Sequence, residues 1–189
     1  MPGLRPAVFL DRDGTLNVDR SYILRPEDMQ LLPGVGEALR RLQAAGFACV
    51  VVTNQSAVGR GMMTDVDLDQ VHAEMKRQLA ALGVTLDGIY ACTIAPRTED
   101  KIALEYPDRK PGPGMLLRAA ADLGLDLARS WMIGDTLRDI LAGQNAGCHE
   151  CILVRTGHPI DETQFGLAEP FHVADDLVAA ARLVLANYA

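Results

Sequence analysis

Short apolar runs alternate along the chain with longer segments in which apolar residues recur every three or four positions. The apolar runs have the length of buried strands and lie at residues 7–11, 47–53, 88–93, 131–135 and 151–155. The segments with helical spacing lie at residues 35–45, 64–82, 113–124, 137–146 and 175–187. Strands that alternate with single helices are typical of a parallel sheet covered by helices on both faces. The pattern therefore predicts an α/β fold, a three-layer sandwich around a central parallel sheet, in one domain over residues 1–189.

Capping and turn residues mark where several of these elements end. Thr64 or Asp65 caps the second helix, and Gly83 ends it. Pro113 opens the third helix, because its fixed φ and missing N–H suit the first helical turn. Before this helix, residues 94–110 form a polar loop that is long for a compact domain, and loops of this length often carry function.

Carboxylates, hydroxyls and a lysine follow the ends of the predicted strands. Asp11 and Asp13 follow the first strand, Thr53 ends the second and Asp135 ends the fourth, while Lys110 ends the long loop. The carboxyl ends of parallel strands meet at one edge of the sheet, where α/β proteins bind their ligands. Close carboxylates repel one another and need a cation to stay ionised together. Hard oxygen ligands beside a phosphate suit Mg²⁺, so the sequence predicts a magnesium site there.

This group of residues has the chemistry of phosphoryl transfer. Asp11, fixed at a rigid strand end, is the candidate nucleophile, and Asp13, two residues on and on the same side of the strand, is a candidate acid and base. Thr53 and Lys110 would hold the phosphoryl oxygens. The role of Asp139 stays open, because it could orient Lys110 or simply be an acid favoured by the dipole in a first helical turn.

Composition and charge exclude several other classes of function. Of 189 residues, 49% are hydrophobic and 23% charged, which excludes disorder as the main state, and the net charge of −7 argues against a nucleic-acid partner. No apolar run approaches the roughly 18 residues of a membrane span, and the N-terminus does not resemble a signal peptide. The four cysteines are unevenly spaced, at Cys49, Cys92, Cys148 and Cys151. They indicate a reduced, cytoplasmic protein. We also expect a monomer.

Four ordered motifs resemble those of the haloacid-dehalogenase-like (HAD-like) phosphohydrolases. They are DRDGTL at residues 11–16, TNQ at 53–55, KP at 110–111, and GD at 134–135 followed by Asp139. The resemblance implies an Mg²⁺-dependent phosphatase with Asp11 as nucleophile and Asp13 as acid and base, and with Mg²⁺ held by Asp11, Asp13 and Asp135. It also implies that the rest of a small sugar-phosphate substrate contacts Asp19, Arg20, Ser21, Tyr22, Asn54, Gln55, Ser56 and Arg109.

The closer resemblance is to a branch of this family that acts on small phosphomonoesters. It implies removal of the C7 phosphate from a heptose bisphosphate, with histidinol phosphate as the main alternative substrate. A module that accepts and keeps a phosphoryl group is a further alternative, but the acid and base at Asp13 argues against it. The stretches at residues 16–47 and 60–110 are too short for a large cap domain. We therefore expect an open site whose specificity comes from loops.

The same branch commonly holds a structural zinc ion in the long loop, through four cysteine and histidine ligands. Here Cys92 matches the first ligand, but the other three positions hold Ile94, Tyr106 and Asp108. One remaining ligand cannot complete a four-coordinate site. We predict that the chain binds no structural zinc and that apolar contacts order the loop, with Ile102, Leu104 and Tyr106 as candidates.

Overall fold

A parallel six-stranded sheet forms the middle layer of the computed structural model, which describes residues 3–100 and 102–188. The strands lie in the order β3-β2-β1-β4-β5-β6, and each pairs in parallel with its neighbours. Their bounds are β1 Ala7–Leu10, β2 Ala48–Asn54, β3 Gly88–Cys92, β4 Trp131–Gly134, β5 Glu150–Val154 and β6 His172–Ala174. The predicted α/β fold with a central parallel sheet is confirmed.

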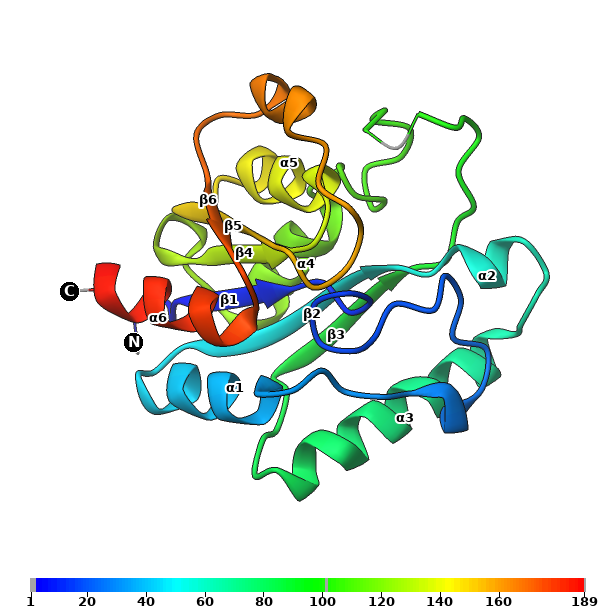
Figure 1. Ribbon diagram of the computed structural model, residues 1–189, viewed down its shortest axis with the longest axis horizontal. Coiled ribbons are helices and arrows are strands. Elements are labelled where there is room, and N and C mark those ends of the chain that lie inside the picture. The colour runs from blue at the N-terminus through cyan, green and yellow to red at the C-terminus, as the bar shows by residue number, and fades with distance from the viewer. Residues whose placement is uncertain (1–2, 101, 189) are drawn as a thin grey trace.

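Helices cover both faces of this sheet (Figure 1). One face is covered by α1 Val35–Ala44, α3 Asp65–Ala81 and α6 Leu177–Asn187, and the other by α4 Gly114–Leu123 and α5 Leu137–Ala146. Shorter turns lie in the connections: η1 Pro26–Asp28, α2 Ser56–Gly59, η2 Leu127–Arg129 and η3 Glu162–Leu167. Among the described residues, no helix is both long and apolar enough to cross a membrane.

Strand β1 shows why the apolar runs of the sequence are continuous. Val8 and Leu10 pack into the core under α1, α3 and α6, whereas Ala7 and Phe9 pack into the core under α4 and α5. All four residues are fully buried. A strand between two helical layers needs an apolar side chain at every position, because its successive side chains point to opposite faces.

The helix ends follow the predicted capping chemistry closely. The Thr64 hydroxyl accepts the N–H of Asp67 at 3.2 Å, and the Asp67 carboxylate accepts the N–H of Thr64 at 2.8 Å, which closes a capping box at the start of α3. The sequence pattern did not predict β6 or α2. Both are very short, and β6 exists because His172–Ala174 pairs with the edge of β5.

The strand order determines where along the edge of the sheet a crevice opens. From β1 the chain moves through β2 to β3 on one side, and β4 then pairs with β1 on its other side. The chain connections therefore leave β1 and β4 in opposite directions, which opens a crevice beyond their carboxyl ends. Asp11 follows β1 and Asp135 follows β4. The topology thus brings these two carboxylates to opposite sides of one crevice.

Candidate active site

Lys110 lies at the centre of the buried end of this crevice. Its Nζ atom lies 2.7 Å from Asp11 Oδ1 and 2.6 Å from Asp139 Oδ1, and it donates to the carbonyl of Val52 at 2.8 Å. Lys110 is 2% exposed and Asp139 is fully buried. The three N–H donors of the ammonium group each have a partner, so its position is fixed from three directions.

The backbone of Lys110 is fixed as well. Asn54, the last residue of β2, accepts the N–H of Lys110 through Oδ1 and donates through Nδ2 to the Lys110 carbonyl, both at 3.1 Å. This pair of hydrogen bonds fastens the end of the long loop to the sheet. A lysine 99 residues away in sequence thereby reaches Asp11.

The charges of the buried group shift its protonation. The pKa of Asp11 is raised to about 7, mainly by burial; the Lys110 charge opposes this rise, and the Asp139 and Asp135 carboxylates add to it. Burial would lower the pKa of Lys110, but the charges of Asp11 and Asp139 raise it instead. Burial likewise opposes ionisation of Asp139, but the Lys110 charge outweighs it and lowers its pKa. Three carboxylates around one ammonium group leave excess negative charge, which a bound cation would relieve.

The carboxylates have the donor chemistry of a magnesium site. Oxygen atoms of Asp11, Asp135 and Asp139 all lie within 4.8 Å of one another. Asp139 is engaged by Lys110, which leaves Asp11 and Asp135 with oxygens that could bind a cation. Two carboxylates with space for water suit Mg²⁺, which keeps several of its water ligands.

Close backbone packing fixes the Asp135 carboxylate. Its Oδ2 atom accepts the N–H of His158 and contacts His158 Nδ1, both at 2.9 Å. A Cβ atom on Gly14 would lie 2.5 Å from the same oxygen, and one on Gly157 would also overlap it. Gly14 additionally has a φ of 78°, in the left-handed region that favours glycine. Residues without a side chain are therefore required beside Asp135.

Asp13 lies outside the cluster of three carboxylates. Its side chain accepts hydrogen bonds from Arg12 at 2.9 Å, Gln55 at 3.0 Å and Asn17 at 2.9 Å. Burial opposes ionisation, but the Arg12 charge and these hydrogen bonds lower the pKa of Asp13 below its usual value. The geometry therefore favours the charged carboxylate, which can accept a proton.

Arg12 is a residue that the sequence argument missed. It is 1% exposed and donates to Asp13 and, at 2.9 Å, to Gln55. Gln55 in turn donates to Thr53 Oγ1 at 2.8 Å, so a chain of hydrogen bonds joins Arg12, Asp13, Gln55 and Thr53. Arg12 lies between two acids just beyond the end of β1, and that position was the available signal.

These residues line one cavity of about 440 Å³, which lies outside the carboxyl ends of β1, β2 and β4. It brings together every candidate residue but one: Asp11, Asp13, Asp19, Ser21, Tyr22, Thr53, Asn54, Gln55, Ser56, Arg109, Lys110 and Asp135. Arg60, Arg138 and His158 also line the cavity, and no sequence pattern predicted them there.

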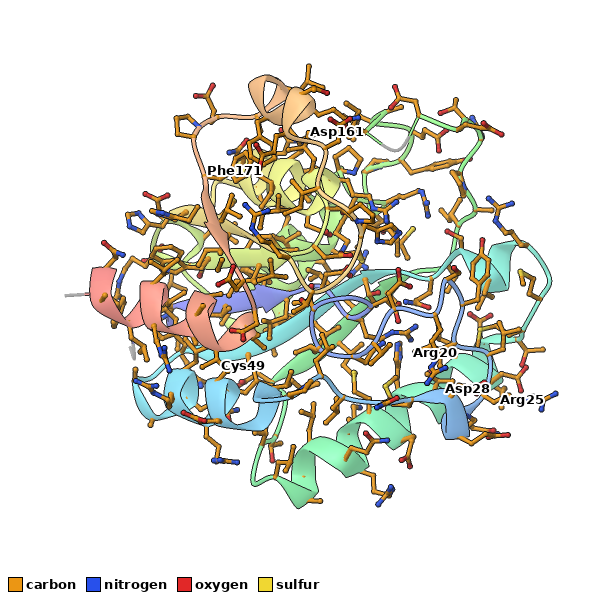
Figure 2. All side chains as sticks on the ribbon, viewed as in Figure 1. Arg20, Arg25, Asp28, Cys49, Asp161 and Phe171 are labelled. Carbon is orange, nitrogen blue, oxygen red and sulfur yellow. The ribbon has the colours of Figure 1, made fainter. Side chains whose placement is uncertain are left out.

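Arg20 is the exception among the candidate residues. Its side chain is exposed, donates to Gln30 at 3.2 Å and does not line the cavity. Figure 2 shows it on the loop that leads to η1. Arg20 therefore lies outside the cavity lining, and the substrate contact expected of it stays a prediction. The neighbouring Ser21 has a φ of 64°, and Asp19 accepts its N–H at 2.8 Å, so the backbone turns sharply between these two residues.

Polar contacts order the long loop. The Glu105 carboxylate accepts the N–H of Arg97 at 3.0 Å and that of Thr98 at 2.6 Å. The Arg97 guanidinium lies 4.9 Å from the centre of the Tyr106 ring. Leu104 is 65% exposed, so the expectation that it packs in an apolar cluster is wrong. A surface loop has little apolar area to bury, and its backbone N–H groups need acceptors.

Comparison with known proteins places this site in a family. The HAD-hydrolase-like family model matches residues 108–180. A D-glycero-D-manno-heptose-1,7-bisphosphate 7-phosphatase of Thermosynechococcus vestitus is 42% identical, over 98% of this chain and 98% of that protein. The corresponding D-glycero-beta-D-manno enzyme of Yersinia pestis is also 42% identical, over 97% of each.

A solved structure agrees with these sequence relatives. The D,D-heptose 1,7-bisphosphate phosphatase of B. bronchiseptica, complexed with magnesium and phosphate, superposes with a TM-score of 0.85 and 37% identity, over 96% of this chain and 98% of that one. Fold and site thus define a HAD-like phosphatase, an enzyme that hydrolyses phosphomonoesters. Within that class, the chain belongs to the D-glycero-D-manno-heptose-1,7-bisphosphate 7-phosphatase family. The resemblance that the four motifs predicted is confirmed.

Proposed function

We propose that the protein removes the C7 phosphate of D-glycero-D-manno-heptose 1,7-bisphosphate. One observation carries the proposal: Asp11 and Lys110, which form a buried ion pair, line a cavity of about 440 Å³ that is large enough for a sugar phosphate. The names of the relatives, which match the chain over nearly its whole length, support this substrate.

Mg²⁺ is the metal that this site fits. Asp11 and Asp135 would hold it through their side chains, with a backbone carbonyl near Asp13 as a further ligand. When bound, the ion would neutralise negative charge on the phosphoryl oxygens. The magnesium and phosphate bound in the B. bronchiseptica relative support this assignment.

In the first half of the reaction, a carboxylate oxygen of Asp11 attacks the phosphorus atom. A bond from Asp11 to phosphorus forms while the bond from phosphorus to the C7 oxygen breaks. This half uses the protonated form of Asp13, which gives its proton to the leaving oxygen and becomes the charged carboxylate that its hydrogen bonds favour, while Thr53 and Lys110 balance the charge on the phosphoryl group. The products are the dephosphorylated sugar and an aspartyl-phosphate.

In the second half, water attacks the phosphorus atom of the aspartyl-phosphate. The Asp13 carboxylate takes a proton from this water, the bond between Asp11 and phosphorus breaks, and inorganic phosphate leaves. The hydrogen bonds from Arg12, Asn17 and Gln55 favour the charged form of Asp13 that this step uses. The second half therefore regenerates the starting enzyme.

The loops around the cavity would determine which substrate binds. Asp19, Ser21 and Tyr22 line one part of its wall, and the long loop contributes another part that includes Arg109. We further propose that residues 1–189 act as one domain, as a monomer in the cytoplasm. The four free cysteines, three of them buried, suit that compartment.

A side-by-side phosphate-release assay tests the substrate. Heptose 1,7-bisphosphate and histidinol phosphate are compared with Mg²⁺ and with a chelator. We expect the heptose substrate to have at least a hundredfold higher kcat/KM and the chelator to abolish turnover. A preference for histidinol phosphate would overturn the substrate assignment. An acyl-phosphate that persists for minutes would contradict hydrolysis and indicate a phosphate-accepting module.

Metal analysis of the same purified protein tests the prediction about zinc. We expect far less than one zinc ion per chain, because Ile94, Tyr106 and Asp108 offer at most one ligand in addition to Cys92. Stoichiometric zinc that survives dialysis would contradict the prediction.

A further inference from the structure

Three arginines from separate elements line the cavity that holds Asp11. Arg60 follows α2, Arg109 precedes Lys110 in the long loop, and Arg138 lies in the first turn of α5. Arg109 is 8% exposed, Arg138 is half-buried and Arg60 is exposed. The proposed mechanism of phosphate removal uses none of them.

Among the described residues, none of these arginines forms an ion pair with a carboxylate. Arg109 Nη1 donates to Ser56 Oγ and to the carbonyl of Ile94, both at 2.9 Å and both uncharged. Among the residues that the structure describes, the side chains of Arg60 and Arg138 take part in no hydrogen bond and no ion pair. Their donors are therefore free to bind a ligand.

Arg109 lies close enough to Arg138 and to Arg60 to be affected by both of their charges. Burial lowers the pKa of Arg109, and the positive charges of Arg138 and Arg60 lower it further, while Cys92 and Glu105 oppose this. A group of like charges in a partly buried cavity attracts an anion. Placement of Arg138 in the first turn of α5 also opposes the helix dipole, so helix stability does not explain this residue.

Carboxylates line the same cavity, and most of them are already engaged. Glu105 accepts the N–H groups of Arg97 and Thr98, and Asp19 accepts that of Ser21. Asp100 accepts the N–H of Ile102 at 3.0 Å. These carboxylate oxygens thus accept loop N–H groups and do not pair with the three arginines, and Glu99 is a further acid of this wall.

We infer that Arg60 and Arg138, together with Arg109, form a second anion subsite that takes the distal phosphate of a sugar bisphosphate. The inference rests on the proposed function, because a bisphosphate has one phosphate at Asp11 and another that needs cations elsewhere in the cavity. Arginine is suited to this role, since its planar fork of N–H donors matches phosphate oxygens.

The test compares a bisphosphate with its matching monophosphate. For the wild type, Arg138→Gln, Arg60→Gln and Arg138→Lys, kcat/KM is measured on heptose 1,7-bisphosphate and heptose 7-phosphate. The measured ratio is kcat/KM for the bisphosphate divided by kcat/KM for the monophosphate. We expect this ratio to fall at least tenfold in Arg138→Gln and in Arg60→Gln, mainly because KM for the bisphosphate rises. It should recover partly in Arg138→Lys. A purely structural defect would lower both values together and leave the ratio unchanged.

Arg182→Gln is the matched control, because Arg182 is an exposed arginine on α6, outside the cavity lining. Its ratio should stay within twofold of the wild type. If the wild type hydrolyses the heptose bisphosphate but the ratio does not change in Arg138→Gln and Arg60→Gln, the inference is wrong and the proposed function stands.

If the wild type does not hydrolyse the heptose bisphosphate, the proposed function is wrong. The same ratio is then measured on fructose 1,6-bisphosphate and fructose 6-phosphate. A tenfold fall in the two variants would support the subsite, and an unchanged ratio would overturn it.

Discussion

The buried end of the cavity and its exposed mouth use charge in different ways. At the buried end, Lys110 lies between Asp11 and Asp139, so each charge meets an opposite charge within 2.7 Å. At the mouth, the carboxylates of Glu105 and Asp19 accept backbone N–H groups instead. Charge pairing in a dry site fixes the reacting groups, whereas the open mouth leaves its arginines available to the substrate.

The difference also separates stability from specificity. Loss of one partner from a buried ion pair typically costs about 3–5 kcal/mol, because the other charge remains buried without compensation. An exposed pair contributes about 0–1 kcal/mol. Variants at the buried end should therefore affect folding and every substrate alike. Variants at the mouth should change the choice of substrate.

The largest effect is expected for Asp11→Asn, which tests whether the buried end performs the chemistry. The amide cannot act as the nucleophile, so kcat should fall on the order of 10⁴-fold or more for all substrates. Phosphate release from heptose bisphosphate and from a simple aryl phosphate measures this loss. Turnover within tenfold of the wild type on either substrate would contradict the assignment of Asp11.

Asp139→Asn should show how much the buried ion pair contributes. We expect a loss of about 1.5–3 kcal/mol in the free energy of unfolding, because Lys110 loses one of its two carboxylate partners and keeps Asp11. Urea denaturation gives this value. The matched control is Glu37→Gln, since Glu37 pairs with Arg41 at 3.8 Å on the surface and should change stability by less than about 0.5 kcal/mol. Equal losses in the two variants would remove the distinction between buried and exposed charge.

The free energy of unfolding, measured against pH, tests the buried residue His72, whose pKa depends on the Arg12 charge. Burial and the Arg12 charge lower the pKa of His72 to about 4, with Asp13 opposing. The unfolded chain, with a histidine pKa near 6.5, then binds more protons between pH 4 and 6.5. Stability should therefore fall by up to about 3 kcal/mol as the pH drops through that window.

The variant His72→Gln separates this effect from other titrations. Glutamine does not ionise, so the decrease in unfolding free energy between pH 6.5 and pH 4 should be smaller in the variant by the same amount. Parallel curves for wild type and variant would show that His72 does not cause the decrease.

The smallest effect is expected at the mouth, for Glu105→Ala. The variant removes the acceptor for the N–H groups of Arg97 and Thr98, each bond contributing about 1 kcal/mol, and both groups can bond to water instead. KM should therefore rise roughly fivefold, with a change in unfolding free energy below about 1 kcal/mol. Glu169→Ala, on an exposed loop, is the control. A larger effect on folding than on KM would contradict the division between mouth and core.

Local pattern was enough to predict most of the elements. The alternating cores on β1 require the continuous apolar run at Ala7–Leu10, and the capping box at Thr64 fixes the start of α3. The predicted bounds differ from the observed ones by one or two residues at most helix ends. The misses were β6 and α2, which are too short to carry a periodic pattern.

The candidate site was predictable for a topological reason. Asp11, Thr53 and Asp135 each end or follow a parallel strand, and parallel strands end at a common edge. The wall of the mouth was harder to predict. Arg20 faces away from the cavity, and the contacts of Glu105 depend on how an irregular loop folds back.

The sequence by itself determined the fold class, the edge of the sheet that bears the chemistry and the carboxylates placed there, because strand periodicity and strand ends are local properties. Only the tertiary structure decided that Asp139 pairs with Lys110, that Arg12 supports Asp13, and that Arg60 and Arg138 share one cavity. Those contacts join residues from different elements, and their distances depend on the packing of the whole chain.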